Sequence, residues 1–220
     1  MQSSYLKLSL LKRITMGCCL LVSLVCFAHI GYLECKSYLA QALLEHAWTQ
    51  TQTQREEQTQ AGENFRLNIK PWPWADVYPV AKLSIERLNL SYLVLNNDSG
   101  QALAFGPGLS GISNNSAFDF TKTQVMSGHR DSHFEFLSQV IVGDELLVES
   151  PSGQVTSYII DQFSVIDSRV TELYLPDDLL GYFSENEENT SVGLVLLTCY
   201  PFNSASASTP YRYVVEAHKV

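Results

Sequence analysis

Beyond its first 35 residues the chain is almost without cysteine. Four of its five cysteines, Cys18, Cys19, Cys26 and Cys35, lie in or beside one apolar segment, and the rest of the chain contains Cys199 alone. A single cysteine has no disulfide partner within its own domain, which excludes a disulfide-stapled scaffold. Because free cysteine is often simply buried, Cys199 by itself leaves a structural and a reactive role open.

The chain also lacks the positive charge that nucleic-acid binding requires. Lysine and arginine total 14 against 23 aspartate and glutamate residues, and the formal net charge is −9. A nucleic-acid-binding surface needs a basic footprint, so this class of function is excluded. An acidic surface is also a common means of solubility, and the charge therefore identifies no partner.

A third absence marks the N-terminal part, because residues 14–33 contain no Asp, Glu, Lys or Arg. A helix of about 20 residues, rising roughly 1.5 Å per residue, spans the ~30 Å hydrocarbon core of a bilayer. Lys7, Lys12 and Arg13 precede the segment. The positive-inside rule therefore predicts that residues 1–13 are cytoplasmic and that the large domain lies across the inner membrane, in the periplasm.

A cleavable signal peptide and a lipoprotein signal are the alternatives to this signal anchor. A signal peptide ends in a small-x-small site, which Ala28-His29-Ile30 matches poorly. The residues before Cys26 are not the small ones that a lipoprotein cysteine requires. We therefore predict an uncleaved transmembrane anchor at 14–33, followed over 34–70 by a juxtamembrane helix and a polar, Gln/Thr-rich stalk.

From residue 71 to residue 220 the pattern changes to short β-type runs with few helical segments. Several runs alternate apolar and polar residues, as half-buried strands do. Many short strands with little helix predict an all-β domain, either a sandwich or a closed barrel. The predicted strands are 80–88, 92–95, 123–126, 145–149, 155–167, 192–198 and 213–217, with helical turns near 134–137 and 176–183.

Three polar residues stand at the ends of predicted strands. His129 follows the run 123–126, Cys199 ends the run 192–198, and Arg212 opens the last run. A thiolate attacks a carbonyl, an imidazole protonates the leaving amine, and a guanidinium stabilises the oxyanion, so the set suits acyl transfer. Each residue alone also has an ordinary explanation, as a turn histidine, a buried thiol or a surface charge.

The order His, Cys, Arg and the surrounding motifs resemble the sortases, which are membrane-anchored cysteine transpeptidases. The motifs are Ser-Gly-His-Arg-Asp-Ser-His-Phe at 127–134, Leu-Leu-Thr-Cys-Tyr-Pro-Phe at 196–202 and Arg-Tyr-Val-Val at 212–215. Trp-Pro-Trp-Ala-Asp at 72–76 and Leu-Ala-Phe-Gly-Pro-Gly at 103–108 resemble the proteobacterial, Gram-negative branch in particular. The resemblance covers nearly the whole outer domain, but Val195 replaces the first threonine of the family's Thr-Leu-x-Thr-Cys segment.

The resemblance implies a closed β-barrel of about eight strands with short helices and a site at one end. It implies that Cys199 attacks the Thr–Gly bond of an LPXTG-like C-terminal sorting signal on a substrate protein, forming a thioacyl enzyme that an amine acceptor resolves. His129 would be the acid/base, and Arg212 would stabilise the oxyanion and the substrate. The expected substrate-binding residues are Thr198, Ser127, Tyr200, Leu173 and Tyr174.

No cofactor is expected, although some sortases bind calcium through the loop that here spans 167–190. Glu185, Glu187 and Glu188 lie in this loop, and calcium requires several oxygen ligands, but a solvated loop is the simpler interpretation. Asp131 suits the orientation of Arg130 or of the histidine loop. His133 suits a loop or helix-cap position better than a second catalytic base.

Two other functions remain open on the sequence. An L,D-transpeptidase acting on peptidoglycan stem peptides also places histidine before cysteine, but that family has Ser-x-Gly-Cys where this chain has Leu-Thr-Cys. A tethered, non-enzymatic β-domain would bind partners through Trp72, Trp74 and the aromatic residues between Tyr200 and Tyr213. Replacing Cys199 by serine distinguishes a cysteine enzyme from a non-enzymatic binding domain, because only the enzyme would lose its function.

Overall fold

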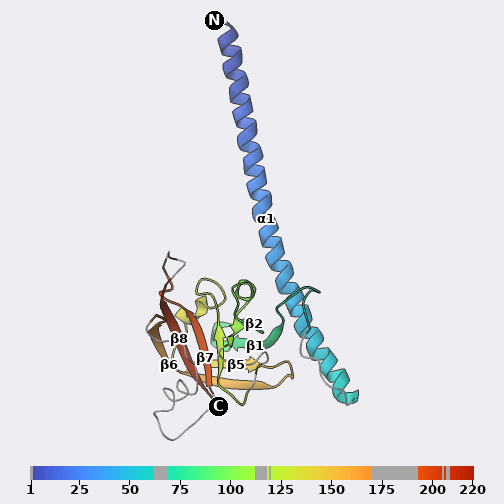
Figure 1. Cartoon of the computed structure of the whole chain (residues 1–220), viewed down its shortest axis with the longest axis vertical. Helices are drawn as coiled ribbons and strands as arrows, with labels where there is room; N and C mark the ends of the chain where they lie inside the picture. The colour runs from blue at the N-terminus through green and yellow to red at the C-terminus, as the bar shows by residue number, and fades with distance from the viewer. Residues whose placement is uncertain are drawn as a thin grey trace. The chain divides into compact units, whose positions relative to one another are not determined.

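The computed structural model describes residues 2–61, 69–111, 118, 120–169, 193–204, 206 and 209–220. These residues form two compact units, Met1–Ala42 and Leu43–Val220. The N-terminal apolar segment lies in a long helix, α1 (Gln2–Ala61) (Figure 1). Its stretch Thr15–Gln54 is long and apolar enough to cross a membrane, a criterion that an N-terminal signal sequence also meets.

The Gln/Thr-rich stretch is helical up to Ala61. The hydroxyl groups of Thr49, Thr51 and Thr53 each donate to the backbone carbonyl four residues earlier, at 2.9, 2.8 and 3.0 Å. This local hydrogen bonding satisfies the threonine side chains without interrupting the helix. The stretch that the sequence indicated as a stalk therefore begins as a continuation of α1.

The last turns of α1 belong to the same compact unit as the barrel, which begins at Leu43. Leu44 and Trp48 are four residues apart on one helix face, and both are buried. The apolar cluster that they join consists of Leu44, Trp48, Val77, Leu93, Leu95 and Ala102, with half-buried Trp72 and Phe105 packed against it. A polar contact adds to it, since Gln52 Nε2 donates to Glu149 Oε1 at 2.6 Å.

Within the described residues, eight strands close into a barrel in the order β1-β2-β3-β4-β7-β8-β6-β5. Figure 1 shows β6, β8 and β7 side by side, in agreement with their antiparallel pairing. Among the strand pairs that the structure describes, β2–β3 and β4–β7 are parallel and the others antiparallel. The strands are β1 (Pro79–Ile85), β2 (Leu90–Leu95), β3 (Gly108–Leu109), β4 (Gln124–Ser127), β5 (Glu145–Glu149), β6 (Val155–Asp167), β7 (Gly193–Cys199) and β8 (Tyr211–Lys219).

The closed all-β barrel expected from the sequence is confirmed, with two local differences. The run predicted over 80–88 divides into β1 and a 3-10 turn, η1 (Glu86–Leu88), and Asn89 follows with φ of 52°. The two-residue strand β3 was not predicted. Other 3-10 turns are η2 (Ala102–Ala104) and η4 (Glu135–Ser138), which corresponds to the predicted turn at 134–137. The predicted helix at 176–183 lies outside the described residues.

The barrel interior is filled by side chains that alternate along the strands. The largest fully buried side chains of this core include Tyr158, Phe134, Phe136, Leu83, Ile85, Leu109, Met126, Leu137, Leu146 and Ile160. Phe134, Phe136 and Leu137 come from the segment around η4 and not from a strand, so this segment fills the barrel beside the strands. The core therefore includes the chain that directly follows His129.

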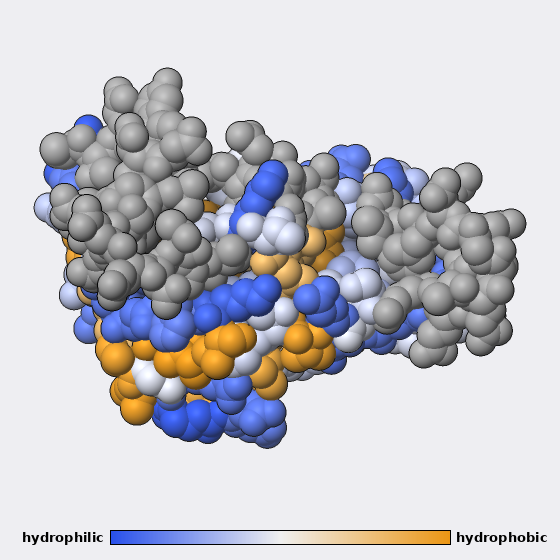
Figure 2. Space-filling view, turned by 90° about the horizontal axis from the view of Figure 1, so that it is seen from below, coloured by the Kyte–Doolittle hydropathy of each residue, from blue (hydrophilic) through white to orange (hydrophobic). Residues whose placement is uncertain are grey.

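On the face seen from below in Figure 2, hydrophobic residues reach the surface with hydrophilic residues on either side. Exposed large apolar side chains of the barrel unit include Trp74, Ile141, Val142, Val155, Val165, Tyr211 and Val220. Individual apolar residues at the surface are normal for a folded protein. We assign no binding role to this face.

Replacing Trp48 by alanine should lower the free energy of unfolding of residues 43–220 by about 3–5 kcal/mol, because it leaves a cavity in the cluster around Leu95. The adjacent exposed residue gives the control: Thr49→Ala should change the free energy by less than about 0.5 kcal/mol. Urea denaturation measures both. A loss below about 1 kcal/mol for Trp48→Ala would show that the helix adds little to the stability of the barrel unit.

Arg87 and Asp144 predict a pH-dependent contribution to stability. Arg87 donates to both oxygens of the buried Asp144 carboxylate, at 2.6 and 2.7 Å, and the Ile141 N–H donates to it at 2.9 Å. The pKa of Asp144 is lowered below its usual 3.8, and the hydrogen bonds from Arg87 are the main cause. A lowered folded-state pKa gives stability that is present above the unfolded pKa of about 3.9 and is lost as pH falls through the folded pKa.

Arg87→Met should therefore lower the melting temperature at pH 7, and the difference from wild type should shrink below about pH 4. Thermal unfolding followed by circular dichroism across this range tests the expectation. A difference of the same size at pH 7 and at pH 2.5 would contradict it.

Candidate active site

Three strand ends meet at one edge of the barrel. Ser127 at the end of β4 pairs with Leu197 of β7, and Cys199 at the end of β7 pairs with Arg212 of β8. The Gly128 N–H donates to the Leu197 carbonyl at 3.1 Å, which continues the ladder to the residue before His129. The structure thus places His129, Cys199 and Arg212 at one edge of the barrel, on or directly after three adjacent strands.

Cys199 and Arg212 are direct cross-strand partners on the same face. The Tyr200 N–H donates to the Tyr211 carbonyl at 3.0 Å, so the next pair along is a hydrogen-bonded one. Since hydrogen-bonded and non-hydrogen-bonded pairs alternate in an antiparallel ladder, Cys199 and Arg212 form a non-hydrogen-bonded pair, in which the side chains lie closer. Cys199 is half-buried, and so is Arg212.

This face is the outer face of the barrel. Along β7, Leu194 and Leu196 point into the main core, whereas Val195 joins a separate cluster. Cys199 has the same strand parity as Val195, and a strand alternates its faces with period two. The separate cluster consists of buried Val125, Val195 and Val214, with half-buried Ile166 and Leu197. An apolar strip across β4, β7, β8 and β6 therefore leads to Cys199.

A glycine and a buried ring fix the loop that carries His129. A Cβ at Gly128 would lie 2.5 Å from the Phe134 ring, so only glycine fits between β4 and His129. The Phe134 N–H donates to the His129 carbonyl at 2.9 Å, which closes the loop, and the Phe134 side chain is fully buried. The His129 side chain is exposed. An exposed imidazole is thus carried on a backbone that the core holds.

Thr198 links β7 to this loop. Its side chain is buried, and its Oγ1 donates to the Gly128 carbonyl at 2.7 Å. The sequence suggested that Thr198 shapes a substrate pocket, and its hydrogen bond to the peptide unit before His129 was not expected. The contact joins the end of the predicted cysteine strand to the start of the predicted histidine loop.

Arg212 is held by backbone carbonyls of the segment that precedes it. Its Nη1 donates to the Thr209 carbonyl at 2.6 Å and to the Tyr211 carbonyl at 3.0 Å. A guanidinium has five N–H donors. No further hydrogen-bond partner of Arg212 occurs among the residues that the structure describes, so the remaining donors can serve a ligand.

Ser127 and Tyr200 are the other predicted site residues that the structure describes. The Ser127 Oγ donates to Asp98 Oδ2 at 3.1 Å, which adds a carboxylate to this edge that the sequence analysis did not identify. Tyr200 stacks on Tyr213, with ring centroids 6.0 Å apart, and precedes Pro201 through a cis peptide bond. Leu173 and Tyr174, as well as Glu185, Glu187 and Glu188, lie outside the described residues.

His133 and Asp131 differ in their surroundings. His133 is half-buried, with the edge of its ring toward Tyr92 at 6.2 Å between centroids. Burial, and to a lesser degree the nearby His129, lower the pKa of His133 below its usual 6.5, so it is neutral at physiological pH. Asp131 is exposed, and within the described part of the chain it forms no hydrogen bond to Arg130.

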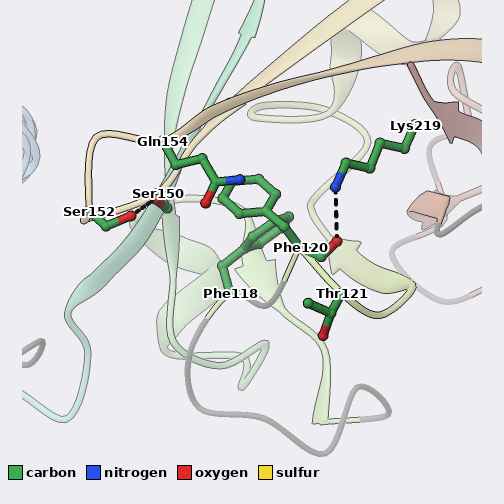
Figure 3. Close-up of a pocket in the computed structure, with 7 residues that line it drawn as sticks. All are labelled: Phe118, Phe120, Thr121, Ser150, Ser152, Gln154 and Lys219. Atoms are coloured by element: carbon green, nitrogen blue, oxygen red, sulfur yellow. Dashed lines mark hydrogen bonds between the residues drawn. The ribbon is translucent and has the colours of Figure 1, made fainter.

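No group of three or more potential metal-ligating side chains is found in the described ranges. A pocket of about 340 Å³ lies at the other end of β8, where Lys219 Nζ donates to the Phe120 carbonyl at 3.3 Å (Figure 3). Its lining residues are Phe118, Phe120, Thr121, Ser150, Ser152, Gln154 and Lys219. Lys219 and Arg212 are separated by roughly 23 Å of strand at about 3.3 Å per residue, so this pocket is separate from the candidate site.

The Sortase domain family model matches residues 83–220, which include the whole candidate site. Sortase D of Bacillus subtilis (strain 168) is 32% identical to the chain over 96 residues, which cover 44% of this chain and 42% of that protein. The chain thus matches less than half the length of this relative.

Solved sortase structures share the fold. The Clostridium perfringens sortase D5 transpeptidase has a TM-score of 0.53 at 16% identity, over 83% of this chain and 99% of that chain. Sortase A from Corynebacterium diphtheriae has a TM-score of 0.51 at 18% identity, over 84% and 90%. Clostridium perfringens sortase C, solved with the C-terminal cell wall sorting motif, has a TM-score of 0.50 at 14% identity, over 80% and 88%.

These relatives come from Bacillus, Clostridium and Corynebacterium, so the expected affinity with proteobacterial sortases stays a prediction. The family model covers well over half of the chain, and the solved structures have the same closed barrel. The match favours an enzyme over a non-enzymatic β-domain and over an L,D-transpeptidase. The chain belongs to the sortase family of cysteine transpeptidases.

Proposed function

We propose that the protein cleaves an LPXTG-like C-terminal sorting signal and transfers the cleaved protein to an amine acceptor at the cell envelope. The observation that carries the proposal is the pairing of Cys199 with Arg212 beside the loop of His129, in a chain of the sortase family. This edge supplies a thiol, an imidazole and a guanidinium from three adjacent strands.

In the proposed first half-reaction the Cys199 thiolate attacks the carbonyl of the Thr–Gly bond. The Arg212 guanidinium, already held by the Thr209 carbonyl, directs its remaining donors to the oxyanion. His129 protonates the glycine nitrogen, the C–N bond breaks and a thioester to Cys199 is left. In the second half-reaction the acceptor amine attacks the thioester and gives a proton to His129, and the Cys199 thiolate leaves.

The apolar strip on the outer face supports an extended signal peptide as the substrate. Leu197 and Ile166 are half-buried members of the strip. Leu197 lies two residues before Cys199 in β7, and Ile166 of β6 is a cross-strand partner of Arg212. Ser127 lies at the same edge on β4 and Tyr200 directly follows Cys199, so both fit a position beside the peptide. Clostridium perfringens sortase C was solved with a C-terminal cell wall sorting motif, which supports this class of substrate.

Leu173 and Tyr174 stay proposed contacts for the apolar residue of the signal, and calcium at Glu185, Glu187 and Glu188 is a less favoured proposal. The membrane location is proposed as well. The apolar part of α1 and the basic residues before it support an inner-membrane anchor with residues 1–13 in the cytoplasm and the barrel in the periplasm.

LPXTG-like peptides with hydroxylamine should give an acyl adduct on Cys199 and a hydroxamate product, both followed by mass spectrometry. Cys199→Ala should abolish both while its circular dichroism spectrum is unchanged, because the thiolate is the nucleophile. If no peptide forms an adduct while a thiol probe still labels Cys199, the acyl donor is different, for example a peptidoglycan stem peptide. If the probe does not label the folded protein either, the assignment of Cys199 as nucleophile is wrong.

Thr198→Val should lower kcat by about tenfold or more with little change in KM. The variant leaves the Gly128 carbonyl unpaired, which costs about 1–3 kcal/mol and loosens the loop of His129. Thr198→Ser keeps the hydroxyl and is the matched control, with activity near wild type. Steady-state kinetics with the best peptide measure both variants. A rise in KM at constant kcat would instead indicate that Thr198 contacts the substrate.

A further inference from the structure

Arg130, the residue directly after His129, is a buried cation. Its side chain is only 7% exposed, although arginine is rarely buried unless it is paired. No carboxylate forms an ion pair with Arg130 among the described residues, and the neighbouring Asp131 points to solvent. Removing a guanidinium from water without an acidic partner is costly, so its hydrogen bonds need an explanation.

Those hydrogen bonds reach the segment between β7 and β8. Arg130 Nη2 donates to the Ser204 carbonyl at 3.1 Å and also to the Ser206 carbonyl. The two acceptors are 74 and 76 residues away in the sequence. Nη1 is buried as well and has no hydrogen-bond partner in the part of the chain that the structure describes. One buried guanidinium therefore connects the histidine loop to a segment from the other side of the site.

The same segment positions the other two members of the site. It leaves β7 directly after Cys199, and its Thr209 carbonyl accepts from Arg212 Nη1 at 2.6 Å. Thr209 Oγ1 also donates to the Tyr200 carbonyl at 2.7 Å, which joins the start of the segment to its end. The segment is thus held by Arg212 at one place and by Arg130 at another.

We propose that Arg130 is a positioning residue for acyl transfer, which holds His129 in register with Cys199 and Arg212 by fastening the histidine loop to the β7–β8 segment. The inference rests on the proposed function of these three residues. Lysine keeps a cation with N–H donors, but its single ammonium nitrogen lacks the planar guanidinium and has no counterpart to the buried Nη1.

The first test compares Arg130→Lys and Arg130→Ala with wild type in the full-length protein, in detergent, with the peptide and hydroxylamine assay. We expect kcat to fall by about 10- to 100-fold, the range that a displacement near 1 Å causes, with KM nearly unchanged. The rate of Cys199 alkylation should not change. Ethylguanidinium added to Arg130→Ala should restore part of the lost kcat, but it should not restore activity to His129→Ala.

Arg87→Lys is the matched control. Arg87 also donates from Nη2 to a backbone carbonyl, that of Gln139, at 2.8 Å. Arg87 lies in η1, next to the Ile85–Leu90 pair at one end of β2. The other end of β2 is the one near the site, because Leu95 pairs with Gly108 of β3 and Gly108 pairs with Ser127 of β4. The control variant should lose thermal stability but keep its kcat per active site, counted by mass spectrometry of the alkylated peptide that contains Cys199.

Hydrogen–deuterium exchange separates this inference from the proposed function. Amides of the loop 128–134 and of residues 200–204, 206 and 209 should exchange faster in Arg130→Lys than in wild type, whether or not the peptide is a substrate. Unchanged exchange, or wild-type kcat per alkylatable Cys199 in both Arg130 variants, would overturn the positioning role. If wild type itself transfers no peptide while exchange responds as expected, the proposed function fails and the fastening role of Arg130 stands.

Discussion

The parallel pairing of β4 with β7 is the constraint on which the candidate site depends. Adjacent parallel strands end at the same edge, so Ser127 and Leu197 lie side by side and the residues after them emerge together. An antiparallel pair would have placed His129 and Cys199 at opposite ends. The Gly128–Leu197 and Thr198–Gly128 hydrogen bonds extend this pairing beyond the last ladder residue of β4. Antiparallel β8 then begins at this edge with Tyr211, and its second residue, Arg212, pairs with Cys199.

Much of the barrel could be predicted from the sequence because its strands are periodic. Runs such as β5 and β6 show an alternation that burial on one face imposes, and their predicted bounds agree with the structure. β3 has only two residues, too few to carry a period, and its place depends on Gly108, where a Cβ would lie 2.1 Å from the Asn97 carbonyl oxygen. The burial of Trp48 could not be predicted from the sequence either. A single apolar helix turn before a polar run does not indicate which strand packs against it.

The candidate site shows the same contrast between residues that could be predicted from the sequence and residues that could not. His129, Cys199 and Arg212 stand in short motifs that the sequence displays directly. The groups that hold them do not, because each contact joins distant parts of the chain: Thr198 to Gly128 across 70 residues, and Arg130 to Ser204 across 74. A buried threonine and a buried arginine look like ordinary polar residues until the fold supplies their carbonyl acceptors. Long-range hydrogen bonds of this kind depend on barrel closure, which a single sequence does not reveal.

The arrangement reconciles two requirements that oppose each other. A group that reacts with a peptide must be accessible, and His129 is exposed and Cys199 half-buried. Exposed side chains are ordinarily mobile, whereas acyl transfer needs its groups in a fixed geometry. Here the backbone beneath the reactive side chains is fixed by buried groups: the Phe134 ring, the Thr198 hydroxyl and the Arg130 guanidinium. Rigidity therefore comes from the residues beside the predicted catalytic ones, and access is preserved because the reactive side chains themselves stay out of the core.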